Sequence, residues 1–395
     1  MEDSVRNTQS RLLLTTLALL ALILAACGGS ETGSPTTTVD SAGETTPTDS
    51  GIELGDPLTG VDDLISAAQA EGTVNLIALP DTWANYVEII KTYKDTYGVD
   101  NPVASPDASS ADEVTAIKTL AGQPDMPDAV DVGPSFTSQL IDEGLITPYK
   151  VSTWDEIPDA LKDPDGNWVA AYYGIMSFGV NTTIIEEAPR TWADLLDPQY
   201  ANSVALNGDP REAGAAFAAV MAASIANGGS FDDIMPGIEY FADLKEAGNL
   251  LVIDVTEAAL ASGEVPIALD WTYNFPGVIP ALEDAGITME VIVPGDGLYG
   301  GYYAQAVVAD SPHPEAAKLW IEHIVSDAGA LGYLRGGAIP ARYGSLVERG
   351  LVDEDIAKNL PTQEQIDAIA FPSQAQIDGA NAMLLEHWGP MVADQ

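Results

Sequence analysis

Two short segments of the sequence place carboxylates beside aromatic rings. Asp81 stands two residues before Trp83, and Asp270 is followed directly by Trp271 and, two positions further, by Tyr273. A carboxylate pairs with an ammonium group, and each ring face that contacts a cation contributes about 0.5–2 kcal/mol. These residue types predict a site for an organic cation, provided that the fold brings the two segments together.

The chain shows no pattern that would carry catalysis. HExxH, GxSxG, P-loop and dinucleotide-binding glycine motifs are absent from its 395 residues. Its three histidines are not spaced as metal ligands with one another. Adjacent carboxylates are frequent, but a chain this acidic contains such pairs by chance. We therefore expect no enzyme activity, no cofactor and no metal site.

The charge balance excludes some classes of partner. The sequence has 15 Lys plus Arg against 60 Asp plus Glu, a formal net charge of -45. Binding to phosphates needs a Lys/Arg surface, so nucleic acid is not an expected partner. A basic patch that would hold the protein on an anionic membrane is also missing. Most of the acidic surplus is expected to be solvated surface.

The N-terminus has the features of an export signal. Residues 12–26 form an apolar run shorter than the roughly 20 residues of a membrane-spanning helix. Residues 24–26 and the single cysteine, Cys27, resemble a bacterial lipobox, which implies removal of residues 1–26 and attachment of lipid to Cys27. The following residues, to 56, are rich in Gly, Ser, Thr, Pro and acids, so 27–56 is expected to be a lipidated cysteine with a flexible tether.

From residue 57 onward, short apolar strands alternate with helical patterns. Strands are expected at 73–79, 129–132, 174–181, 204–206, 265–270, 287–293 and 302–309. Helices are expected from 61 to Gly72, from 86 to Gly98, from a capping box at Ser110–Glu113 to about 121, at 213–226 and 233–247, and from Pro314 to 325. The alternation predicts an α/β fold with a largely parallel sheet and helices on both faces.

Six segments occur in an order that resembles one known family. They are Thr73–Leu79, Tyr173–Asn181, Pro189–Pro198 (similar to P-x-T-W-x-D-L-x-D-P), Val204–Pro210, Pro312–Trp320 and Gly337–Pro340. This order resembles the extracellular solute-binding proteins of ABC importers, in the branch of polyamine, ferric-iron, thiamine and 2-aminoethylphosphonate binders. The resemblance covers about residues 57–390.

The resemblance implies a two-lobed, type II periplasmic-binding-protein-like fold with a hinge of crossing strands. Lobe 1 would contain 57–175 and about 303–345, and lobe 2 would contain 176–302 and about 346–395, with the C-terminal helices free to pack on both. A ligand would bind between the lobes, at the carboxyl ends of strands. The expected partners are a small solute and the subunits of a membrane permease. The protein would act as a monomer outside the cytoplasmic membrane, anchored by its lipid.

The family's topology places the loops after the strands in the cleft. The candidate ligand-binding residues are Asp81, Trp83, Ser135, Asn207, Asp209, Arg211, Asp270, Trp271, Tyr273 and Tyr303. They favour a polyamine-type cation. Two other solutes stay open: ferric iron held by oxygens of Tyr273, Asp81 and Asp270, and a phosphonate held by Arg211. A lipid-anchored enzyme on this scaffold and an adhesive surface lipoprotein are further alternatives.

Overall fold

Glycines end the first two helices, as the sequence predicts. The computed structural model describes residues 60–394, so the expected signal peptide, Cys27 and tether lie outside the described residues. Helix α1 (Asp62–Glu71) ends at Gly72 with φ 80°, and α2 (Tyr86–Tyr97) ends at Gly98 with φ 69°. Glycine adopts this left-handed conformation without the steric cost that a Cβ would bring.

Helix α3 (Ser110–Thr119) begins one residue away from the predicted register. Its capping box is formed by Ser109 and Asp112, whose side chains each bond the other's backbone N–H. The prediction of a Ser110–Glu113 box is therefore wrong, because the neighbouring serine and aspartate satisfy the same helix end. Glu113 therefore takes no part in the cap, and its side chain is buried.

One half of the main sheet surrounds the first part of the long strand β5 (Val169–Asn181). There β5 pairs with β10 (Gly300–Val308) and with β11 (Ile339–Pro340), while β10 also pairs with β3 (Ala129–Val132) and β4 (Ile146–Thr147). A small parallel sheet of β1 (Leu76–Ile77) and β2 (Val103–Ala104) lies next to this half. Helices α1–α3, α4 (Thr137–Asp142), α9 (Pro314–Val325) and α10 (Asp327–Arg335) belong to the same half. We call this half lobe 1.

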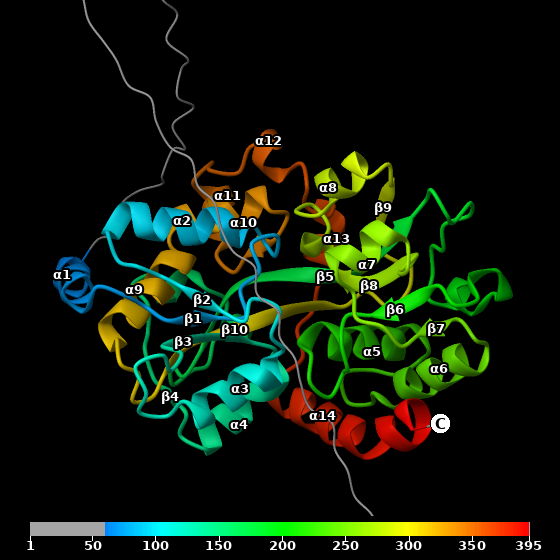
Figure 1. Cartoon of the computed structure of the whole chain (residues 1–395), viewed down its shortest axis with the longest axis horizontal. Helices are drawn as coiled ribbons and strands as arrows, with labels where there is room; N and C mark the ends of the chain where they lie inside the picture. The colour runs from blue at the N-terminus through cyan, green and yellow to red at the C-terminus, as the bar shows by residue number, and fades with distance from the viewer. Residues whose placement is uncertain (1–59, 395) are drawn as a thin grey trace, which may run out of the picture. The chain divides into compact units, whose positions relative to one another are not determined.

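The other half surrounds the second part of β5. It contains β8 (Ile267–Trp271), β9 (Met289–Ile292), β6 (Val204–Leu206) and β7 (Leu250–Leu251). With helices α5 (Gly214–Ala226), α6 (Met235–Glu246), α7 (Glu257–Ser262) and α8 (Ile279–Asp284) it forms lobe 2. Figure 1 shows β5 and β10 running across the middle of the molecule between the two groups of elements.

The sheet is not largely parallel, so this part of the prediction is wrong. β6 pairs in parallel with β7 and β8, but every pairing of β5 and β10 is antiparallel. The chain crosses from lobe 1 to lobe 2 along β5 and returns along β10, so these two strands must run in opposite directions. The β-α-β rhythm of the separate lobes does not reveal this return.

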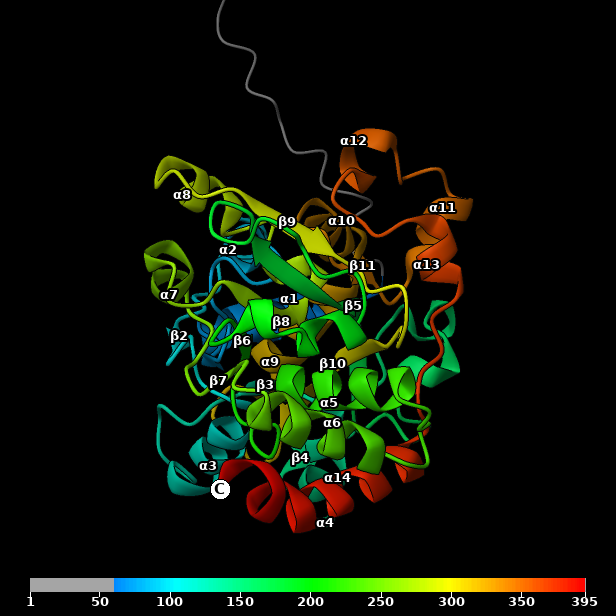
Figure 2. The same ribbon diagram turned by 90° about the vertical axis from the view of Figure 1, so that its right-hand side faces the viewer.

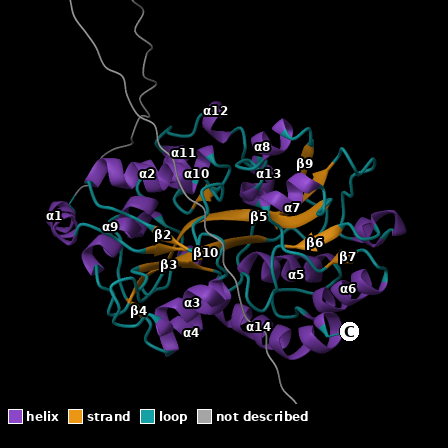
Figure 3. Cartoon of the chain, in the orientation of Figure 1, coloured by secondary structure: helices purple, strands orange, loops and turns teal. Residues whose placement is uncertain are grey.

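Small side chains allow α5 to pack deeply inside lobe 2. Residues from Gly214 to Ser224 of this alanine-rich helix are all buried. The helix lies between the sheet and α6, as the secondary-structure view also shows (Figure 3). Its N-terminus points to the middle of the molecule, where the two lobes meet.

The C-terminal segment contacts both lobes. Helices α11 (Tyr343–Glu348), α12 (Glu354–Ala357) and α13 (Gln363–Asp367) precede α14 (Gln374–Trp388), and α12 packs on α10. Helix α14 packs on the 3-10 turn η1 (Pro134–Phe136) of lobe 1 and on α6 of lobe 2, and Figure 2 shows it beneath α5 and α6. The residue bounds given above for the lobes stay a prediction. Among the described residues, no helix has the length and apolar character needed to cross a membrane.

Candidate functional site

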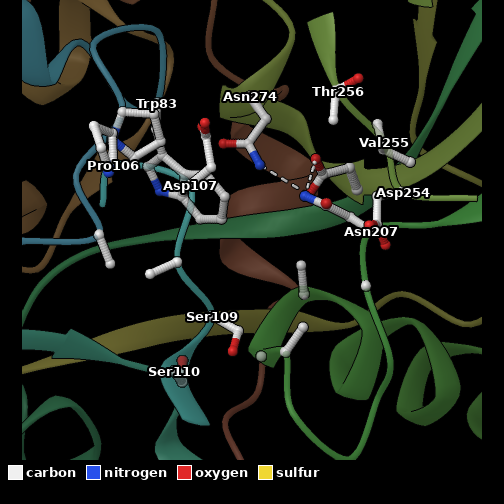
Figure 4. A pocket seen from close by; sticks show the side chains of 18 of the residues that line it. Trp83, Pro106, Asp107, Ser109, Ser110, Asn207, Asp254, Val255, Thr256 and Asn274 are labelled. Carbon is white, nitrogen blue, oxygen red and sulfur yellow. Dashed lines mark hydrogen bonds between the residues drawn. The ribbon is translucent and has the colours of Figure 1, made fainter. Parts of the chain in front are cut away.

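A cavity of about 680 Å³ lies between the lobes. Lobe 1 contributes the loops after β1 and β2, the first turn of α3, and side chains from β3 and β10. Lobe 2 contributes the loops after β6, β7 and β8. Figure 4 shows Trp83, Pro106 and Asp107 on one side of this cavity and Asn207, Asp254 and Thr256 on the other.

The charged lining of the cavity is entirely acidic. Among the described residues, no Lys, Arg or His lines it. Nine acidic side chains do: Asp107, Asp112, Glu113, Asp131, Asp209, Glu212, Asp254, Glu257 and Asp270. Such a lining attracts cations and repels anions.

Asp270 lies one residue before the end of β8 and accepts hydrogen bonds from three donors. Its Oδ1 accepts hydrogen bonds from the Trp271 N–H and from Asn274 Nδ2, both at 2.8 Å, and its Oδ2 accepts one from Asn207 Nδ2 at 2.9 Å. Figure 4 draws the two bonds from the asparagine side chains as dashed lines. Burial raises the pKa of Asp270 to about 6, and these hydrogen bonds limit the rise. The carboxyl is therefore oriented, and residues 60–394 provide no Lys, Arg or His as an ion-pair partner for it.

Aromatic rings form one wall of the cavity. The ring of Trp83 meets Tyr303 edge-on, with centroids 5.4 Å apart, and both residues line the cavity. The Trp83 indole N–H donates to the Tyr172 hydroxyl at 2.8 Å. Tyr273 packs behind them, 5.8 Å from Trp83, and Trp271 stacks on Tyr273 at 6.1 Å.

Two glycines in the crossing strands make room for these rings. A Cβ at Gly174 of β5 would lie 2.5 Å from the Tyr273 ring, and a Cβ at Gly301 of β10 would lie 2.3 Å from the Trp271 ring. Both distances are far inside normal contact. The crossing strands β5 and β10 thus fix the rings of Tyr273 and Trp271, which belong to lobe 2.

The structure brings half of the predicted ligand-binding residues to the cavity wall. Trp83, Asn207, Asp209, Asp270 and Tyr303 line it. The other five do not: Asp81 is exposed, Ser135 is buried in η1, Trp271 and Tyr273 are buried behind the wall, and Arg211 lies outside it.

The guanidinium of Arg211 is already occupied by a neighbouring acid. Its Nε and NH2 donate to the two oxygens of Asp209 at 2.9 and 2.6 Å. The positive charge that an anionic solute would need is therefore paired within the loop after β6.

The sequence analysis missed two buried acids of the cavity lining, Glu113 and Asp131. Asp131 was visible as a lone acid in the otherwise apolar strand at 129–132, which was a signal for a functional carboxylate. Glu113 was taken as a helix cap. Among residues 60–394, no three His, Cys, Asp or Glu come together as a metal site would require.

The profile of the bacterial extracellular solute-binding protein family matches residues 125–371. The chain belongs to this family. It is the substrate-binding receptor of an ABC importer, from a family whose members work outside the cell with permease subunits and are not enzymes. A search of curated proteins found no match.

Solved structures share the two-lobed fold at low sequence identity. The periplasmic binding protein AfuA from Actinobacillus pleuropneumoniae, with fructose-6-phosphate bound, is 19% identical with a TM-score of 0.65, covering 81% of this chain and 99% of that one. Iron-bound HitA from Pseudomonas aeruginosa is 19% identical with a TM-score of 0.60, covering 81% and 99%. A putative spermidine/putrescine ABC transporter protein from Listeria monocytogenes is 14% identical with a TM-score of 0.58, covering 80% and 98%. The solutes in these names differ, so the fold alone does not select one.

Proposed function

We propose that this receptor captures a small cationic solute of the polyamine type and delivers it to a membrane permease. The observation that carries the proposal is the cavity lining, which combines nine acids with aromatic rings and has no cationic side chain among the described residues. Ammonium groups pair with carboxylates, and their methylene chains pack on rings such as Trp83 and Tyr303. The expected export signal and the lipid on Cys27 belong to the same proposal.

Two helix ends at the cavity also support a cation over an anion. Helix N-termini bind anions through free N–H groups. At α3 the first turn is bonded by Ser109 and contains two acids, Asp112 and Glu113. At α7 the Thr256 side chain accepts the N–H of Ala259. Neither of these two helix ends is available to a phosphate. The N-terminus of α5, which also lines the cavity, has no side-chain cap, but Arg211 beside it is paired with Asp209.

A thermal-shift screen tests the solute. The probes are spermidine, putrescine, ferric citrate and 2-aminoethylphosphonate, each added to the full-length chain. We expect spermidine or putrescine to raise the melting temperature, because binding to the folded state alone adds about 2.7 kcal/mol at a hundredfold excess over Kd. Asp270→Ala should abolish the shift.

Asp284→Ala is the matched control. This acid lies at the exposed end of α8 and does not line the cavity, so the variant loses one charge without touching the site. A flat response to polyamines together with a shift from ferric citrate or the phosphonate would overturn the proposal. An equal loss of shift in both variants would show that net charge, rather than the cavity, attracts the polyamine.

A further inference from the structure

Glu113 and Asp131 are buried side by side on the lobe 1 side of the cavity. Glu113 is 1% exposed, and its Oε2 accepts the backbone N–H of Asp131 at 2.9 Å. Its other oxygen, Oε1, has no hydrogen-bond partner within residues 60–394. Both residues line the cavity. Because Glu113 lines the cavity and this oxygen has no donor, a group that enters the cavity can donate a hydrogen bond to it.

The partners of Asp131 are all neutral. Its Oδ2 accepts from the hydroxyls of Tyr86 at 2.7 Å and Tyr172 at 3.0 Å, and its Oδ1 accepts from Gln305 Nε2. These donors orient the carboxyl group but do not cancel a negative charge. None of the residues that the structure describes places a Lys or Arg in ion-pair contact with Glu113 or Asp131.

Two adjacent buried carboxyl groups without a cation cannot both be ionised cheaply. Burial raises the pKa of Asp131 to about 7, while its three hydrogen bonds oppose the rise. Burial, followed by the charge of Asp131, raises the pKa of Glu113 well above its usual value. The titratable side chains that face the pair are one further acid and five tyrosines that stay neutral: Asp112, Tyr86, Tyr172, Tyr273, Tyr303 and Tyr333.

We propose that Glu113 and Asp131 form a second ammonium-binding subsite, on lobe 1, and that the arriving cation displaces a proton from this pair. The inference rests on the cationic solute proposed above. The carboxyl O–H bond breaks and its proton goes to solvent, while the ammonium group keeps its own protons and donates one to the freed oxygen. No covalent bond to the solute forms. With Asp270 on lobe 2, each lobe then offers a carboxylate to the same solute.

This subsite makes binding depend on pH. The solute binds the pair after one of its two carboxyl groups has lost a proton, so the cost of removing this proton weakens binding at low pH. Affinity therefore rises as the pH increases toward 7, and each binding event releases protons below that pH.

Isothermal titration calorimetry with spermidine measures the released protons. The full-length chain is titrated at pH 6.5 in phosphate and in an imidazole-type buffer, because these differ in ionisation enthalpy. We expect about one proton released per spermidine bound. Glu113→Gln keeps an acceptor for the Asp131 N–H, and it should reduce the proton count and weaken binding about tenfold. Glu283→Gln, on exposed α8, is the control and should change neither. Unchanged affinity and proton count in Glu113→Gln would overturn the subsite.

A second measurement does not depend on the solute. In the ligand-free protein, the raised pKa values mean that the unfolded state ionises before the folded state, so stability falls as pH rises from about 4 to above 7. Removing one carboxyl should remove part of this loss. The melting temperature of Glu113→Gln should therefore exceed that of the wild type at pH 8 and match it at pH 4.5.

The two measurements separate the two proposals. If the wild-type protein does not bind spermidine, the proposed polyamine-type solute fails, and the pH series decides on the carboxyl pair. A melting-temperature difference that does not change with pH would overturn the coupled pair whatever the solute.

Discussion

A glycine in lobe 2 touches the backbone of lobe 1 across the mouth of the cavity, and replacing it should hinder closure. A Cβ at Gly277 would lie 2.3 Å from the carbonyl oxygen of Thr82 and 3.0 Å from its carbonyl carbon. Gly277 precedes α8, and Thr82 lies in the loop after β1. Because backbone atoms stand on both sides, no side-chain rotation can relieve the overlap.

The magnitude follows from this distance. Non-bonded heavy atoms approach to about 3.5 Å at their optimum, so Gly277→Ala requires the two segments to separate by about 1 Å. Overpacking of this kind costs about 1–3 kcal/mol. If Gly277 touches Thr82 only when the lobes are closed around a ligand, the full energetic cost of the overlap lowers the affinity for the ligand. Spermidine affinity should then fall by about 5- to 150-fold, with little change in the stability of the ligand-free protein.

Calorimetry with spermidine and small-angle scattering, with and without spermidine, check this prediction. The control is Gly344→Ala in α11, where a Cβ meets nothing within 4 Å; this variant should bind as the wild type does. Gly277→Ala should show a larger radius of gyration than the wild type in spermidine. The reasoning is refuted if affinity stays at the wild-type level, or if the ligand-free variant loses 1–3 kcal/mol of stability, since the contact would then belong to every state.

The remaining predictions concern the fold itself. A Cβ at Gly133 in lobe 1 would lie 2.9 Å from the Cα of Gly214 in lobe 2, so Gly133→Ala should lower the free energy of unfolding by about 1–3 kcal/mol even without ligand. Chemical denaturation measures this change, and an unchanged midpoint would contradict the prediction. His323 is buried against the Ile89 carbonyl, and burial lowers its pKa to about 4, so the folded state resists protonation below pH 6.5. His323→Gln should reduce the loss of stability between pH 6.5 and 4 relative to the wild type, and parallel curves in a pH series of melting temperatures would argue against it.

Features decided by neighbouring residues were predictable from the sequence. Gly72 and Gly98 end helices because only the local backbone conformation matters there. The strand at 129–132 and the helix from Pro314 were likewise predicted with their bounds, since apolar periodicity and proline are local signals. The two-lobed fold came from the order of motifs rather than from any one of them.

Features decided by distant residues were not predictable in this way. The antiparallel pairing of β5 with β10 joins segments more than a hundred residues apart. The capping of α3 could use either of two serines, and the choice of Ser109 released Glu113 toward Asp131. At the site, Asp270 was found because an acid beside aromatic residues is a local pattern. Glu113, on the lobe 1 side of the cavity, was missed because a one-residue shift of the helix start changes which acid is buried.

The packing of α14 determines where a reporter of solute binding should be placed. Gln374 Nε2 donates to the Pro134 carbonyl of lobe 1, while Trp388 meets Phe241 of α6 with ring centroids 5.7 Å apart. Because the single helix α14 contacts both lobes, it restrains their separation, so the distance between the lobes should change least beside it when they open and close. A fluorophore attached at the C-terminus would therefore be insensitive to the solute. A donor on α2 and an acceptor on α8, at the opposite rim, would convert the same motion into a change in energy transfer.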